Sequence, residues 1–142
     1  MGKTAKSSPL KYSDKSAGQP ELAIIFRDIK KHMSVYAKGN FIVKNDKPGA
    51  YELYYGKPIE QQGRAYPELC FSSLLIQKGY VGFYFFPIYA EVSLIKKIDP
   101  DFLKNLKGKT CFYIKRGDPE ILHQLRKTLE MGHQYYLSRG WT

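Results

Sequence analysis

Apolar residues recur along the chain at spacings that predict where helices and strands form. After Pro20, apolar side chains return every three or four positions, which predicts a helix over residues 20–37 with Gly39 at its C-terminal cap. A second stripe of the same spacing predicts a final helix that begins at Asp118 and Pro119. The first stripe is Leu22, Ile25, Phe26, Ile29 and Met33, and the second is Ile121, Leu122, Leu125, Leu129 and Tyr136.

Shorter apolar runs between the two helices predict antiparallel strands. Residues 41–44 and 50–55 are strand-like, and the turn-forming residues 45–49 between them predict a hairpin. Residues 56–67, which contain two prolines and two glycines and show no periodicity, predict a loop. The first half of the chain is therefore predicted to hold one helix, one hairpin and a connecting loop.

The most aromatic stretch of the chain predicts a second hairpin. Residues 70–76 and 80–86 are strand-like, and a tight turn at Lys78 and Gly79 joins them. Both faces of the second strand are apolar, which is typical of a central strand that is covered on both sides. Because successive side chains point to opposite faces, one face holds Val81, Phe83 and Phe85, and the other holds Tyr80, Gly82, Tyr84 and Phe86.

The remaining segments complete the fold. Residues 88–95 predict a short helix or an irregular crossover, and Pro100 opens another helical piece that Gly108 ends. Residues 110–115 predict one more strand, and Gly132 on the final helix allows a close backbone approach. We therefore predict an α+β protein with a single-layer antiparallel sheet of about five strands, on which the N-terminal and C-terminal helices pack.

Length and composition bound the organisation of the chain. Its 142 residues are enough for a single domain with one core. Residues 1–18 combine Lys, Ser, Gly and Pro with few apolar residues, which predicts a disordered basic tail before a domain of residues 19–142. The N-terminal segment has no apolar leader, and Pro87 interrupts the longest apolar run, so we expect a cytoplasmic protein that does not enter a membrane.

The two cysteines, Cys70 and Cys111, lie within strand-like apolar runs. This placement favours buried thiols in a reducing compartment, and a disulfide between neighbouring strands stays open. Cys111 is also close in sequence to Lys109, and a nearby cation would stabilise a thiolate. A structural role is the favoured interpretation for both cysteines.

No segment has the spacing of a known catalytic or metal site. Serine nucleophile motifs, phosphate-binding glycine loops and paired carboxylates are all missing. His32 lies on the polar side of the first helix, and His123 and His133 are ten positions apart, too far around and along a helix to share a metal ion. We therefore predict a protein that is not an enzyme and carries no cofactor or metal. An active site built from residues distant in sequence would leave no local signal.

The order of these motifs resembles the YdhG-like family of bacterial domains of unknown function. The resemblance rests on residues 78–89, on residues 107–115 with Cys111, and on the final helix with Gly132 and Tyr135, and it covers most of the chain after the tail. It implies a compact α+β domain with an antiparallel sheet, and it implies no functional residue. One branch of the family is described as frataxin-like iron chaperones, which depend on exposed carboxylates. Because the 13 acidic residues of this chain are scattered, an iron chaperone is the minor alternative.

Two functional hypotheses remain, and both are non-catalytic. In the first, the chain is a binding module whose aromatic sheet face meets a small apolar or planar ligand or a protein partner. The residues that would make this contact are Tyr84, Phe86, Tyr89 and Tyr113. The alternative is that these aromatics simply complete the core. Whether the chain acts as a monomer or a homodimer is left open by the sequence.

The second hypothesis follows from charge. The chain has 23 basic and 13 acidic residues, and residues 96–116 hold seven basic residues against two acidic ones. This region and the tail would bind nucleic acid or another polyanion, with phosphates neutralised by Lys96, Lys97, Lys104, Lys107 and Lys109. No nucleic-acid-binding motif supports this hypothesis, and a basic face also serves solubility alone.

Overall fold

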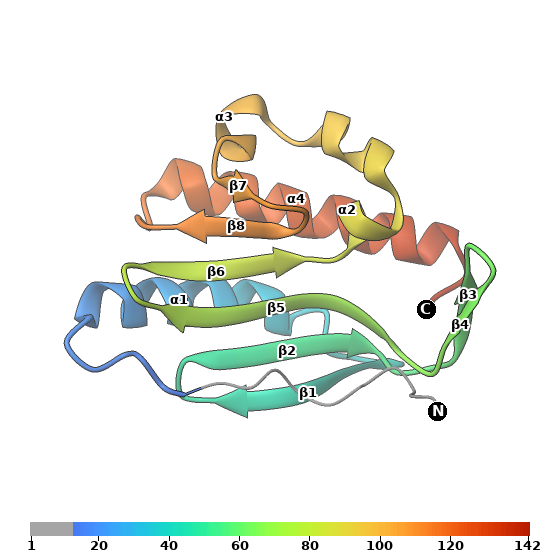
Figure 1. Ribbon diagram of the computed structural model, residues 1–142, viewed down its shortest axis with the longest axis horizontal. Coiled ribbons are helices and arrows are strands. Elements are labelled where there is room, and N and C mark those ends of the chain that lie inside the picture. Colours follow the sequence, from blue (N-terminus) through green and yellow to red (C-terminus); the bar gives the residue numbers. More distant parts are fainter. Residues whose placement is uncertain (1–12) are drawn as a thin grey trace.

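The computed structural model describes residues 13–142, so most of the predicted tail lies outside the described residues. It shows an α+β fold with a six-stranded antiparallel sheet, where the sequence predicts about five strands (Figure 1). The strands follow the order β1-β2-β5-β6-β8-β7 across the sheet. Their bounds are β1 (Phe41–Lys47), β2 (Ala50–Tyr55), β5 (Leu69–Gln77), β6 (Tyr80–Phe85), β7 (Leu106–Lys107) and β8 (Cys111–Ile114).

Two long helices, α1 (Pro20–Ser34) and α4 (Pro119–Ser138), lie on the same face of the sheet, as predicted (Figure 1). Three short helical pieces connect β6 to β7 at one edge of the sheet: α2 (Pro87–Ala90), the 3-10 helix η1 (Val92–Lys97) and α3 (Pro100–Leu103). Residues of this connection line two hollows on the surface of the protein.

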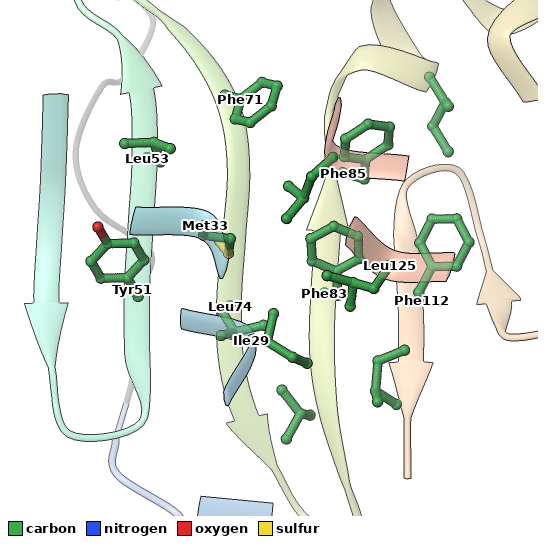
Figure 2. Packing of buried hydrophobic residues seen from close by; sticks show 14 of the residues in the cluster. Ile29, Met33, Tyr51, Leu53, Phe71, Leu74, Phe83, Phe85, Phe112 and Leu125 are labelled. Atoms are coloured by element: carbon green, nitrogen blue, oxygen red, sulfur yellow. The ribbon is translucent and has the colours of Figure 1, made fainter. Parts of the chain in front are cut away.

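The core lies between the sheet and the two long helices. The side chains of Phe83, Phe85 and Phe112 are fully buried there, on the face of the sheet that the alternation of β6 predicts. Figure 2 shows Ile29 of α1 above β5, and Leu125 of α4 near the phenylalanine rings. Both aliphatic residues are also fully buried, so each helix contributes its apolar stripe to one continuous core.

The second hairpin forms as predicted, and the first one differs in its turn. The turn between β1 and β2 consists only of Pro48 and Gly49, because Asn45 and Asp46 belong to β1. Asn45 lies opposite Glu52 and donates a hydrogen bond of 3.2 Å to its carboxylate. Pairing across the strands thus overrides the turn preference of these polar residues.

The predicted loop over residues 56–67 contains a second, two-stranded sheet. Its strands are β3 (Ile59–Gln61) and β4 (Arg64–Tyr66). The turn between them is formed by Gln62 and Gly63, which both have positive φ angles, of 55° and 73°. Such angles at both central residues are characteristic of the tight turns that join strands with a right-handed twist. The hairpin was missed because its strands have only three residues each.

Two predicted helix ends are wrong. Helix α1 ends at Ser34, and Gly39, with φ of 61°, lies in the turn that leads to β1. Helix α3 ends at Leu103, and Gly108, with φ of 84°, forms the turn between β7 and β8. In both cases glycine supplies the positive φ of a turn instead of a helix cap, because it lies beyond the end of its helix and a strand begins within three residues of it.

The sheet face opposite α1 and α4 is rich in tyrosine. We call it the tyrosine face and define it by Tyr54, Tyr80, Tyr84 and Tyr113, which the strand registers place on the same side. The pairing of Ser73 with Tyr84 and of Tyr84 with Cys111 makes one row of side chains across three strands.

No helix among residues 13–142 combines the length and apolar character needed to cross a bilayer.

Candidate ligand-binding site

Tyr84 and Tyr113 of the proposed aromatic contact lie side by side on the tyrosine face and are engaged by protein neighbours. The ring of Tyr113 stacks on Tyr80 with 3.8 Å between ring centres and 5° between ring planes. Burial, followed by contact with Cys111, raises the pKa of Tyr84 to about 12. A methyl group at Gly82 would lie 2.9 Å from the Tyr84 ring, so glycine here makes room for that ring. These two tyrosines therefore pack mainly against the sheet itself.

The other two predicted residues lie where the chain leaves the sheet. Pro87 starts helix α2 directly after β6, and this places Phe86 and Tyr89 next to each other with 5.0 Å between ring centres. Tyr89 is 46% exposed, an unusual amount for a large aromatic residue in a helix that packs against the core. The four residues thus divide into an engaged pair on the sheet and a pair at its rim.

Tyr89 forms one wall of a hollow of about 520 Å³. We call it the apolar hollow; it lies between α2, η1 and the turn from β7 to β8. Val92 is the most exposed of its large apolar side chains, with 66% of its surface accessible to solvent. The complete lining is Gln62, Ile88, Tyr89, Val92, Ile95, Leu106, Gly108 and Lys109.

Polar groups stand at the rim of the apolar hollow. The ammonium of Lys109 lies 5.9 Å from the centre of the Tyr89 ring, a distance at which a cation is attracted to an aromatic face. The Gln62 amide donates a hydrogen bond of 3.5 Å to the carbonyl of Ala90, and this bond links the β3–β4 turn to α2. The hollow therefore offers an aromatic wall, aliphatic walls and one cation.

The five lysines of the polyanion hypothesis do not form one continuous track. Lys96 and Lys97 line a different hollow, beside α4. Lys104 makes an ion pair of 3.3 Å with Asp101, while Lys109 lies at the apolar hollow. Lys107 pairs with Cys111 at the edge of the sheet. The basic segment seen in the sequence is therefore divided among several places on the surface.

The two cysteines behave as structural residues. Burial raises the pKa of Cys111, and it raises the pKa of Cys70 to about 12. Both thiols are free, so the disulfide that the sequence left open is not formed. The thiolate role considered for Cys111 is not supported either, because Lys109 lies over the Tyr89 ring and does not lower the pKa of the thiol.

The histidines do not assemble a metal site. His133 packs among aromatic rings, with ring centres 4.7 Å from Tyr36 and 5.2 Å from Phe41, and burial lowers its pKa. His123 lies within 3.3 Å of Arg126 on the surface of α4. Within residues 13–142, no three side chains of the His, Cys, Asp or Glu type converge.

Reasoning from the sequence missed the aliphatic half of the apolar hollow. Three segments that are far apart in the chain meet there, and Val92, Ile95 and Leu106 attract no attention as isolated aliphatic residues. Sequence spacing alone cannot show that Tyr89 and Lys109 face the same space.

Known proteins add no assignment to this geometry. The chain was compared with models of protein families, with curated proteins and with solved structures, and no match was found in any of the three. The resemblance to the YdhG-like family therefore stays a prediction.

Proposed function

We propose that this protein is a non-catalytic binding module whose apolar hollow holds a small molecule with a planar or aliphatic body and an acidic group. The observation that carries the proposal is the exposure of Tyr89 and Val92 in the walls of one hollow, with the ammonium of Lys109 beside the ring. Two free thiols with raised pKa values fit the expectation of a reducing compartment such as the cytoplasm.

The size and lining of the hollow suit a small ligand. Sites for such ligands span roughly 300–1,000 Å³ and combine apolar walls with a few polar groups, and about 520 Å³ falls within that range. Covering apolar surface contributes about 25 cal/mol per Å², so an exposed valine and an exposed tyrosine face supply a large part of the binding energy. An aliphatic or aromatic side chain of a protein partner would use the same walls.

Electrostatics favours an acidic group on the ligand. Lys109 is the cation nearest to the aromatic wall, and none of the residues that line the hollow is acidic. The net charge of +10 adds attraction for anions at a distance. Nucleic-acid binding has less support because the lysines of residues 96–116 are divided between sites, and an iron chaperone has less support because no carboxylates gather among the described residues.

A fluorescence titration with 1-anilinonaphthalene-8-sulfonate, a probe with an aromatic body and an acidic group, tests the proposal. Val92→Ser removes apolar surface from the hollow and is expected to weaken binding about fivefold. The matched control is Val35→Ser, since Val35 is 60% exposed and lies beyond the end of α1. Equal binding by both variants and the unmodified protein would contradict the proposed site.

The charge of the site is tested separately. Lys109→Gln keeps the turn between β7 and β8 and removes the cation, so the sulfonate probe is expected to bind more weakly and with less dependence on salt. Lys78→Gln is the control, because Lys78, like Lys109, lies in a hairpin turn next to a glycine of positive φ. A loss of the same size in both variants would show that only the overall charge matters.

A further inference from the structure

A second hollow is lined by a later part of the connection between β6 and β7, residues 96–100. It has a volume of about 380 Å³ and is enclosed by η1, the start of α3 and the middle of α4. We call it the basic hollow, because Lys96, Lys97 and Lys127 are among its lining residues. We infer that the basic hollow binds a compact anion that carries adjacent phosphate groups.

The three lysines come from two elements that only the tertiary structure brings together. Lys96 and Lys97 end η1, and Lys127 lies in α4, thirty residues further along the chain. In the part of the chain that the structure describes, none of the three is within ion-pair distance of a carboxylate. Three like charges around one hollow repel one another, and an anion relieves that repulsion.

One carboxylate, that of Asp99, also lines the basic hollow. This carboxylate already has hydrogen-bond partners in the backbone, because it accepts bonds of 3.0 Å from the amide of Asp101 and 3.2 Å from the amide of Phe102. These bonds cap helix α3 and hold the carboxylate toward its amides. The lining therefore keeps an excess of positive charge.

The arrangement favours a phosphate-bearing anion over other anions. A lysine ammonium acts on phosphate as a point charge, and several ammonium groups together match a group with more than one negative charge. Single carboxylates carry too little charge to compensate three cations. Gln124 adds a polar side chain to the lining, and Pro100 and Met131 form apolar walls next to the charges.

A small ligand fits this site better than nucleic acid does. Proteins that bind single strands lay a long basic groove along the backbone, whereas the basic hollow is bounded by η1 and α4. The neighbouring cations do not extend it, since Lys104 pairs with Asp101 and Lys109 lies at the apolar hollow. The inference goes beyond the proposed function because the two hollows share no lining residue.

Calorimetric titration with inorganic pyrophosphate at low salt tests the inference. Lys127→Gln is expected to weaken pyrophosphate binding about tenfold, because one charge-assisted contact is lost. The control is Lys31→Gln in α1, which removes an exposed helical lysine of the same kind far from the hollow along the chain. Because Lys127 is exposed, circular dichroism should show that both variants stay folded.

Three outcomes would overturn the inference. The first is the absence of pyrophosphate binding to the unmodified protein at low salt. The second is an equal loss of affinity in Lys31→Gln and Lys127→Gln, which would indicate a general effect of charge. The third is tighter binding of a twenty-nucleotide single strand that depends on Lys96, Lys97 and Lys127, which would assign the lysines to a nucleic-acid interface. Lys127→Gln should still bind the sulfonate probe, because Lys127 does not line the apolar hollow. The test of the basic hollow is therefore independent of the test of the apolar hollow.

Discussion

Gly132 is the position where the packing of α4 on the sheet can be tested most directly. A methyl group added there would lie 2.3 Å from the Cζ atom of Phe85 and 2.8 Å from the Cγ atom of Pro87. Carbon atoms pack best at about 3.5–4.0 Å, so the closest contact is short by more than about 1 Å. The Phe85 ring is fully buried, with ring centres 5.7 Å from Phe83 and 6.1 Å from Phe71, and cannot swing away.

These distances set the size of the expected effect of Gly132→Ala. Overpacking of a core costs about 1–3 kcal/mol, and so severe a contact belongs at the upper end of that range. The better helix propensity of alanine returns about 1 kcal/mol. We therefore expect the free energy of unfolding to fall by about 2 kcal/mol, which corresponds to a decrease of about 8 °C in Tm for a domain of this size.

Urea unfolding followed by circular dichroism measures this change. A second measurement makes the same substitution in a Phe85→Leu background, where the clashing ring carbons are absent. Gly132→Ala should then cost much less, so the two substitutions should not be additive. If Gly132→Ala alone leaves the protein equally stable or more stable, the close approach of α4 to Phe85 is wrong.

Two further predictions concern stability. Tyr136→Phe removes a buried hydroxyl that donates a hydrogen bond of 2.5 Å to the carbonyl of Cys70. The free energy of unfolding, measured in urea, should therefore fall by about 1–2 kcal/mol. The control Tyr89→Phe should change this free energy little, because Tyr89 is exposed. Burial lowers the pKa of His133 below its ordinary value of 6.5, so the unfolded chain takes up a proton first and the free energy of unfolding declines as the pH falls below about 6.5. His133→Phe keeps the ring contacts and should make Tm less dependent on pH in this range; an unchanged pH profile would contradict this assignment.

The sequence predicted those parts of the fold that depend on local burial. The alternation of residues 80–86 placed Val81, Phe83 and Phe85 together on one face, which the structure shows to be buried, and the apolar stripes located both long helices. A period of two or of 3.6 residues can be read from the chain itself, because it records which side of an element is buried. Pro20, Pro100 and Pro119 marked the start of three helices for a similarly local reason.

The candidate site was predictable only in part. Tyr89 and Lys109 both stood out in the sequence, one as an aromatic residue and one as a cation, but they belonged to two different hypotheses. The structure brings them within 5.9 Å and adds Val92, which no motif indicated. In the same way, Lys127 joins Lys96 and Lys97 only because α4 lies beside η1.

The sequence by itself determined the fold class, the order of most elements and the side chains of residues 80–86 that share a face. Only the tertiary structure decided that β7 pairs with β8 at the edge of the sheet, that residues 59–66 form a hairpin, and that the chain between β6 and β7 lines two hollows. The physical reason is the separation in sequence of the residues involved. A burial pattern depends on neighbouring residues and can be recognised in the sequence. A hollow forms where segments distant in sequence have each satisfied their own packing and hydrogen bonds.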